Sequence, residues 1–157
     1  MNEKYITKAL TKAVYTGFEF LKTKKSPIFG WKTPGLRWYC DKYCAWAVPE
    51  DCMTVECPEP QDIHEHRTDT YDYMLVTTGI VKTVCEKPKR QVRVFRDDQT
   101  GKQVAINDNM LKLFDALGSY SLMWDGKEQH AVGVFDTASQ QFVGIIMPVK
   151  LKDEIKL

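Results

Sequence analysis

The most constraining feature of this chain is the regular order of elements predicted in its last third. The stretch QVRVFRDDQTGKQVAI, residues 91–106, places alternating apolar residues on both sides of a DDQTG turn and is typical of a β-hairpin. NDNMLKLFDALG follows as a compact helix, with Asn107 as its N-cap and Gly118 as its C-terminal stop. Three strands separated by DGK and TASQ turns come next. The sequence therefore predicts a hairpin, a helix and three strands.

The first 49 residues have a similar order. Residues 3–16 are predicted to form an amphipathic helix, capped by Asn2 and ended by Gly17. Three short strands follow in PIFGW, GLRWYC and CAWAVP, with a TPG turn between the first two. The apolar side of the helix consists of Ile6, Ala9, Leu10, Ala13 and Val14. Both parts end on an apolar strand that runs into proline, which indicates an α+β domain with internal pseudo-symmetry.

The length of 157 residues predicts a single domain. We place a first unit at about 1–57, an irregular connector at about 58–90, a second unit at 91–151 and a polar tail at 152–157. The connector begins with an acidic, proline-bearing stretch that favours a long loop around one short strand. YDYMLVTTGIVKTV, residues 71–84, fits either a strand or a helix, and the pattern leaves both open.

Charge and hydropathy exclude several classes of protein. The chain has 22 Lys and Arg against 21 Asp and Glu, so no global charge demands a nucleic-acid or membrane partner. No apolar run approaches the roughly 20 residues that span a bilayer. The start, MNEKYITKAL, is too polar for a signal peptide. We expect a cytoplasmic protein without a membrane partner.

The cysteines allow two interpretations. Their odd number, five, favours reduced thiols over a disulfide framework. A zinc site is the alternative, because four cysteines lie close to two histidines: Cys40, Cys44, Cys52, Cys57, His64 and His66. Their spacings lack the paired short knuckles of zinc-binding motifs, and buried cysteine behaves as a small apolar residue. We therefore predict no metal and no cofactor.

An enzyme is the third class considered. In the stretch His64-Glu65-His66 the two histidines are two residues apart. The stretch QTGK, residues 99–102, lacks the upstream glycine of a phosphate-binding loop. Neither these residues nor Cys40, Cys44 and His130 form a nucleophile elbow or a metalloprotease helix. The sequence favours a non-enzymatic protein.

The ending FVGIIMPVKL, residues 142–151, raises a question about exposure. Val143, Ile145, Met147, Val149 and Leu151 share one face of the predicted strand. Proline has no backbone N–H to donate to a neighbouring strand, so the proline at position 148 indicates that the strand ends at a sheet edge or a bulge. A free edge beside apolar side chains favours the binding of another chain, whereas a plain core strand is the alternative.

The second unit resembles the last domain of the bacterial sliding clamp, the beta subunit of DNA polymerase III. The resemblance rests on the stretch VAINDNMLKLFDALGS, the three predicted strands after it and the ending GIIMPVKL. GLRWYCDKYCAWAVP is similar to a clamp-type strand, turn and strand, with Asp41 and Tyr43 at the turn. The resemblance covers residues 91–151 and, more loosely, 3–49. In the family the ending carries an arginine where this chain has Lys150.

The resemblance implies one clamp-like domain built of two pseudo-repeated β-α-β-β-β units. It also implies a groove for short motifs of a polymerase, a clamp loader or a host factor, with the groove residues Ile145, Met147, Pro148, Val149 and Lys150. The helices of clamps face double-stranded DNA, and the residues here that suit phosphates are Lys4, Lys8, Lys12 and Lys112. A solvated helix face explains these lysines equally well.

The functional expectation is a sliding-clamp-like protein that acts in DNA replication or its modulation by binding a protein and, as a second partner, DNA. Clamps carry three such domains per chain, so a ring of single domains needs six copies and an oligomer is expected in that case. The alternative is a monomeric interaction or inhibitor protein of a phage or mobile element, which keeps the scaffold without binding DNA.

Overall fold

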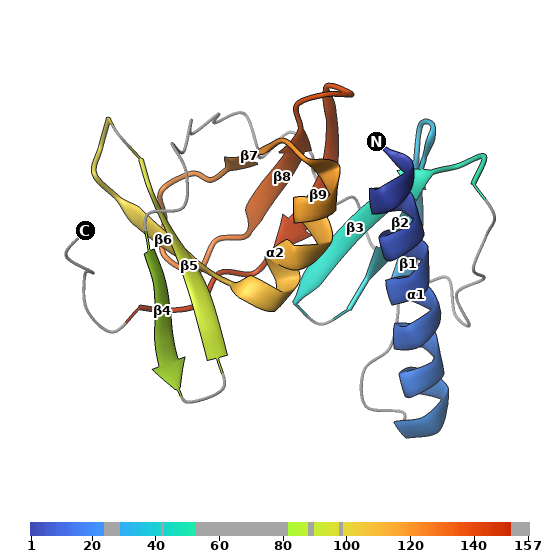
Figure 1. Cartoon of the computed structure of the whole chain (residues 1–157), viewed down its shortest axis with the longest axis horizontal. Coiled ribbons are helices and arrows are strands. Elements are labelled where there is room, and N and C mark those ends of the chain that lie inside the picture. Colours follow the sequence, from blue (N-terminus) through green and yellow to red (C-terminus); the bar gives the residue numbers. More distant parts are fainter. Residues whose placement is uncertain (24–28, 42, 53–81, 88–89, 98, 152–157) are drawn as a thin grey trace.

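The computed structural model describes residues 1–23, 29–41, 43–52, 82–87, 90–97 and 99–151 (Figure 1). In chain order its elements are α1 (Glu3–Thr23), β1 (Phe29–Thr33), β2 (Leu36–Cys40), β3 (Cys44–Pro49), β4 (Lys82–Lys87), β5 (Arg90–Arg96), β6 (Gln103–Asn107), α2 (Asp108–Phe114) with a 3₁₀ turn (Asp115–Leu117), β7 (Tyr120–Met123), β8 (Val132–Asp136) and β9 (Gln141–Ile146). The predicted α+β class is confirmed. The undecided stretch 71–84 lies outside the described residues up to 81, and its last three residues lie in β4.

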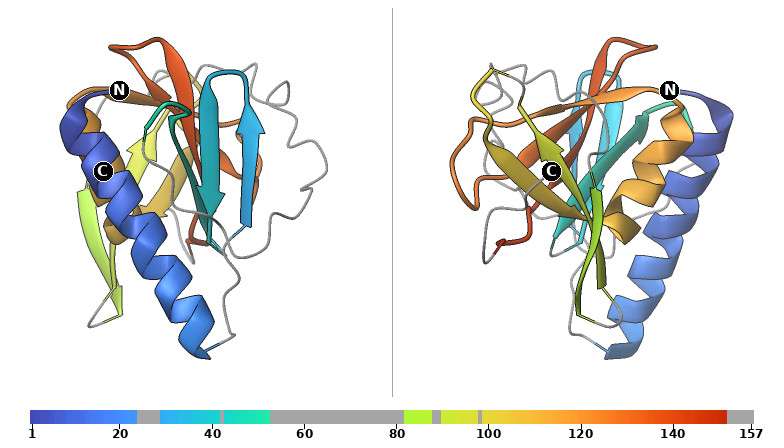
Figure 2. Two further views of the ribbon diagram at one scale, coloured as in Figure 1. Left: turned by 90° about the vertical axis from the view of Figure 1, so that its right-hand side faces the viewer. Right: turned by 60° about the vertical axis from the view of Figure 1, so that its left-hand side comes forward.

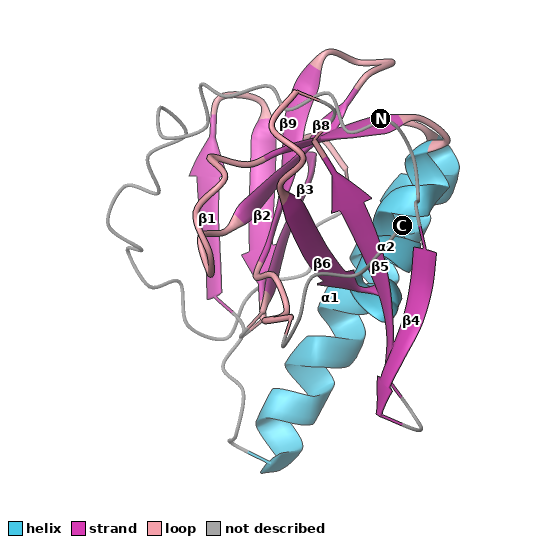
Figure 3. Cartoon of the chain, turned by 90° about the vertical axis from the view of Figure 1, so that its left-hand side faces the viewer, coloured by secondary structure: helices cyan, strands magenta, loops and turns pink. Residues whose placement is uncertain are grey.

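The strands form two antiparallel sheets. The larger has the order β1-β2-β3-β9-β8-β7, and the smaller has the order β4-β5-β6. Both helices lie on the same side of the larger sheet, next to each other (Figures 2 and 3). The main core lies between them and the sheet, where Ala9 of α1, Phe114 of α2 and Trp46 of β3 are all fully buried.

The two halves of the described chain repeat one order of elements. α1 is followed by the antiparallel strands β1, β2 and β3, and α2 is followed by β7, β8 and β9. The last strands of the two halves, β3 and β9, pair antiparallel at the centre of the larger sheet, with Cys44 opposite Ile146 and Trp46 opposite Gly144. β6 directly precedes α2, and no strand of the described chain precedes α1.

α1 begins as predicted but ends at Thr23, beyond the predicted stop at Gly17. The Oδ1 of Asn2 accepts a hydrogen bond from the Tyr5 amide at 2.9 Å and caps the helix. A single glycine costs a helix only about 1 kcal/mol, which neighbouring helix-forming residues offset. Val14, which the sequence places on the apolar side of the helix, is 47% exposed, because the buried face of α1 includes Tyr5, Ala9 and Ala13 instead. Among the described residues, no helix is both long and apolar enough to cross a membrane.

β9 lies in the interior of its sheet, so the alternative of a free strand edge is wrong and the alternative of a core strand is confirmed. The strand ends at Ile146, two residues before Pro148, and pairs with β3 on one side and β8 on the other. The proline rule holds, since Pro148 follows the strand instead of interrupting it. It fixes where the strand stops, but not whether the strand has neighbours.

A β-bulge also changes the predicted faces of β9. The register with β8 shifts between Phe142 and Gly144, which leaves Val143 as the extra residue. Val143 consequently packs in the core beneath the helices, whereas Ile145 packs in a separate cluster on the other face of the sheet. The predicted common face of these two side chains is therefore wrong.

The predicted hairpin is confirmed as β5 and β6, and a polar cluster attaches it to α2. The guanidinium of Arg93 in β5 donates to Asp108 at 2.5 Å and, through two nitrogens, to Asp115 at 2.7 and 2.5 Å. The hydroxyl of Tyr120 also donates to Asp115, at 3.0 Å. Asn107 caps α2 as predicted, by accepting from the Asn109 amide. Arg93 thereby joins the smaller sheet to the helix that covers the larger one.

The same cluster shifts the ionisation of its members. Hydrogen bonding to Asp115 raises the pKa of Arg93 above its usual range, against the opposing effect of burial. Burial opposes ionisation of Asp108, but hydrogen bonds from Arg93 and Lys112 outweigh it, so the pKa of that carboxyl lies below its usual range. Arg93 and Asp108 are therefore charged at neutral pH, and their ion pair helps to hold the cluster.

Candidate partner-binding site

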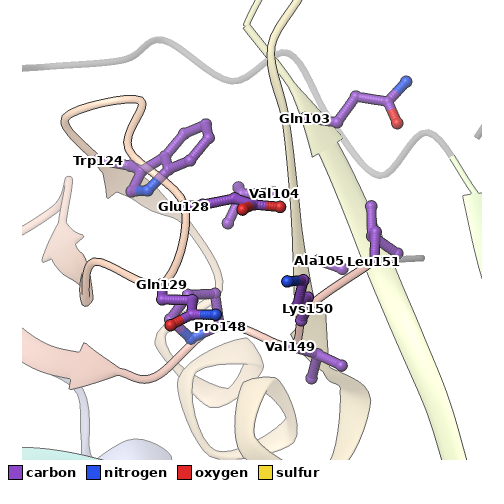
Figure 4. Close-up of a pocket in the computed structure, with 10 residues that line it drawn as sticks. All are labelled: Gln103, Val104, Ala105, Trp124, Glu128, Gln129, Pro148, Val149, Lys150 and Leu151. Carbon is purple, nitrogen blue, oxygen red and sulfur yellow. The ribbon is translucent and has the colours of Figure 1, made fainter. Parts of the chain in front are cut away.

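A pocket lies between β6 of the smaller sheet and two segments that leave the larger sheet (Figure 4). Its walls are residues 103–105 of β6, Trp124 with residues 128–129 of the β7–β8 connection, and residues 148–151 after β9. The cavity measures about 50 Å³. One water needs roughly 10–15 Å³ on this measure, so the pocket has room for a few heavy atoms, about one aliphatic side chain.

The wall after β9 crosses from one sheet to the other. The amide of Met147 donates to the carbonyl of Tyr43 at 2.9 Å, and the amide of Val149 donates to the carbonyl of Ala105 at 2.8 Å. Val149 thus forms an isolated antiparallel bridge on the outer edge of β6. Pro148 lies between the two bonds and has no amide to donate. Backbone bonds on both sides of Pro148 therefore fix this wall.

The β7–β8 connection forms its wall through its own hydrogen bonds. Asp125 accepts from the Lys127 amide at 3.0 Å and lies 2.7 Å from Nδ1 of His130. Burial opposes ionisation of Asp125, but these hydrogen bonds outweigh it and hold the pKa of its carboxyl below the usual range. The indole of Trp124 donates to the carbonyl of Lys127 at 3.0 Å, which orients the ring that lines the pocket.

A single side chain joins the tips of the two hairpins beside the pocket. Nζ of Lys102, after the β5–β6 turn, donates to the carbonyl of Gly126 at 3.2 Å. Gly126 has φ +75°, and a Cβ there would lie 3.1 Å from Nζ of Lys102. The glycine therefore permits both the turn and the close approach of the lysine.

The structure divides the predicted groove residues between different surroundings. Pro148, Val149 and Lys150 line the pocket. Met147 lies just before it, is 41% exposed and does not line it. Ile145 is buried in the cluster on the far face of the larger sheet, so it is not accessible to a partner in this structure. The structure thus brings three of the five residues together.

The predicted DNA-facing lysines also differ from one another. Lys4, Lys8 and Lys112 are exposed, and Nζ of Lys8 donates to the carbonyl of Lys112 at 2.9 Å across the two helices. Lys12 is half-buried: its Nζ lies 2.7 Å from Oδ2 of Asp41 and 4.4 Å from the centroid of the Trp46 ring. Lys12 is therefore engaged in an ion pair and a cation–π contact.

The cysteines of the predicted cluster do not converge where they are described. Cys44 lies in the core beneath the helices, and Cys40 packs against the cluster on the opposite face of the sheet. Burial raises the pKa of Cys44 above its usual range, so its thiol is neutral. Within the described part of the chain, no three His, Cys, Asp or Glu side chains are placed to hold a metal ion. Cys52 is partly buried and follows β3, whereas Cys57, His64 and His66 lie outside the described part.

Sequence reasoning missed the wall made of Trp124, Glu128 and Gln129. The only signal near them is the DGK turn, which predicts a hairpin and says nothing about what its tip approaches. Gln129 has φ +65°, an uncommon conformation for a residue with a side chain, and no sequence pattern announces it. No protein-family model, no curated protein and no solved structure matches the chain.

Proposed function

We propose that this chain is a non-enzymatic, clamp-like binding protein of DNA replication or its modulation, which holds a short segment of a partner protein in the pocket at Pro148. The observation that carries the proposal is the repeated order of the two halves. Each half has a helix and three antiparallel strands, and the closing strands β3 and β9 pair at the centre. This order fits two units of a clamp-type domain whose Met-Pro segment borders a groove.

The size of the pocket supports a protein segment over a small molecule. Small-molecule sites usually measure about 300–1,000 Å³, and this cavity of about 50 Å³ is well below that range. One aliphatic side chain of a bound segment fits it. The backbone of Ala105 in β6 already pairs with Val149, so a bound segment would enter the pocket with a side chain.

One observation favours the alternative, a monomeric interaction or inhibitor protein that does not bind DNA. The engagement of Lys12 with Asp41 and Trp46 removes one cation from the row that would face phosphates. Lys112, on the second helix, lies 3.3 Å from Asp108, which offsets its charge. Solution mass measured by light scattering, with and without duplex DNA, decides between the two. An assembly of about six chains supports a ring, and a monomer indifferent to DNA supports the alternative.

Met147→Asp combined with Val149→Asp is expected to weaken partner binding by at least tenfold, about 1.4 kcal/mol. The reason is that the Asp at position 149 would place a carboxylate on the apolar surface that Val149 forms with Val104 and Ala105, and the Asp at position 147 would add a second charge beside it. Recovery of the bound partner from cell extract, compared between the native and variant proteins, measures the effect. Val14→Asp is the matched control, because Val14 is 47% exposed on α1, on a different element. Equal recovery with both variants would exclude a role for the Met147–Val149 segment.

If the helices meet DNA, Lys4→Ala with Lys8→Ala is expected to reduce the slope of log K against log salt by about two, since each lost phosphate contact contributes roughly 0.9. Titration of a labelled duplex at several salt concentrations measures the slope. Lys127→Ala is the control, because Lys127 is also exposed but lies on the β7–β8 connection. An unchanged slope removes these lysines from any DNA-binding surface.

A further inference from the structure

Two charged side chains of opposite sign lie on different walls of the pocket. Glu128 comes from the β7–β8 connection and Lys150 from the segment after β9, and both are exposed (Figure 4). Neither belongs to an ion pair within the described residues. The pocket therefore offers one acidic and one basic group to an occupant.

The neighbouring charges are engaged elsewhere. Asp125 lies 2.7 Å from His130 and 3.9 Å from Lys127, on the connection that carries Glu128. Lys102, on the facing hairpin, donates to the carbonyl of Gly126. Glu128 and Lys150 are thus the charged residues of the pocket lining, and the charges beside them have their own partners.

The surface between the two charges is mainly apolar. Val104 and Ala105 of β6, the Trp124 ring, and Val149 form it. Val149 already pairs with Ala105 through its backbone, so an occupant reaches this surface with a side chain. The cavity of about 50 Å³ suits one side chain of the size of valine or leucine.

We propose that the occupant is an extended protein segment with one aliphatic side chain in the pocket, a Lys or Arg facing Glu128 and an Asp or Glu facing Lys150. In an extended chain, residues two apart share a face, so the two charges flank the aliphatic residue at alternate positions. This inference rests on the proposed function of the same pocket. The order of the two charges along the segment fixes the direction in which the segment binds.

The test compares acetyl-Lys-Ser-Leu-Ser-Glu-amide with its uncharged counterpart, acetyl-Gln-Ser-Leu-Ser-Gln-amide. Amide resonances of Ala105 and Val149, followed by NMR during titration of the whole chain, report on the pocket. The charged peptide is expected to bind about tenfold more tightly at low salt, because each of its two exposed ion pairs contributes up to about fivefold. The preference should shrink in 1 M salt, where the screening length falls to about 3 Å.

The variant that carries both Glu128→Gln and Lys150→Gln is expected to lose the preference for the charged peptide. Both side chains are exposed, so thermal unfolding of this variant should match that of the native chain. Binding of both peptides with equal affinity overturns the charge selection and leaves the pocket as a binding site. Failure of both peptides to shift the pocket resonances overturns the proposed function together with the inference.

Discussion

Gly144→Ala is expected to lower the free energy of unfolding by about 3 kcal/mol, at the upper end of the usual cost of overpacking a core. A Cβ at position 144 would lie 2.4 Å from two ring carbons of Phe114 and 3.2 Å from Cβ of Val134. The Phe114 ring is fully buried between α2 and the larger sheet, so it has no open space to enter. The midpoint of thermal unfolding should fall by roughly 10 °C.

Two control variants separate this clash from the general effect of replacing a glycine. Gly101→Ala places a Cβ where nothing lies within 4 Å, so only the strain of φ +70° remains, about 1 kcal/mol. Phe114→Leu shortens the facing side chain, and in that background Gly144→Ala should cost clearly less than in the native chain. Additive losses in this double-mutant cycle would mean that the Phe114 ring does not limit position 144.

The packing of Gly144 is an example of a structural feature that the local sequence does not predict. The cap at Asn107, the stop at Gly118 and the β5–β6 hairpin depend on residues within a few positions of one another. Each rests on a local rule, so the sequence predicts them correctly. The close approach of Gly144 to Phe114 depends on residues 30 positions apart, so no hydrophobic periodicity in the sequence predicts it.

The sequence also does not predict how the strands pair, because pairing likewise depends on residues far apart in the chain. Apolar alternation in residues 142–151 predicts a strand, but the pairing of β9 with β3 joins segments from the two halves of the chain. The bulge at Val143 then moves every later side chain of β9 to the other face, which a strict period of two cannot foresee. Ile145, which the resemblance implies as a groove residue, is consequently buried in a core cluster on the other face of the sheet.

The candidate site was only partly predictable because its walls converge from three regions. The Met-Pro ending identified one wall, residues 148–151. β6 and the β7–β8 connection supply the others, and their approach depends on how the smaller sheet is held against the rest of the molecule. The surroundings of Lys12 were not predictable for a similar reason. A row of lysines on a helix predicts exposed side chains, but Lys12 contacts Asp41 and Trp46, which come from a hairpin distant in sequence.

Arg93→Met is expected to lower the free energy of unfolding by about 2–3 kcal/mol. The change leaves Asp108 and Asp115 without their shared counter-charge, and Asp108 is buried. Breaking a fully buried ion pair costs about 3–5 kcal/mol, and the lower figure reflects the 38% exposure of the Asp115 side chain. Arg93→Lys should recover less than half of the loss, because an ammonium cannot donate to both carboxylates as the planar guanidinium does.

Arg96→Met is the matched control, since Arg96 lies on the same strand, is exposed and has no ion pair among the described residues. Its cost should stay within about 0.5 kcal/mol, as for most surface changes. In the Arg93→Met background, Asp115→Asn should restore part of the stability by removing an unpaired charge. Equal denaturant midpoints for Arg93→Met and Arg96→Met would show that the cluster contributes no stability.

The Arg93 cluster also has a consequence for the pocket. β5 carries Arg93 and pairs along its length with β6, which forms one wall of the pocket, whereas the other walls belong to segments of the larger sheet. Loosening the bond between β5 and α2 should therefore let the walls separate. At a temperature where Arg93→Met is still folded, peptide binding should fall by about threefold or more, while Arg96→Met binds normally. Unchanged binding by folded Arg93→Met would mean that the Val149 bridge and the Lys102 contact alone hold the walls together.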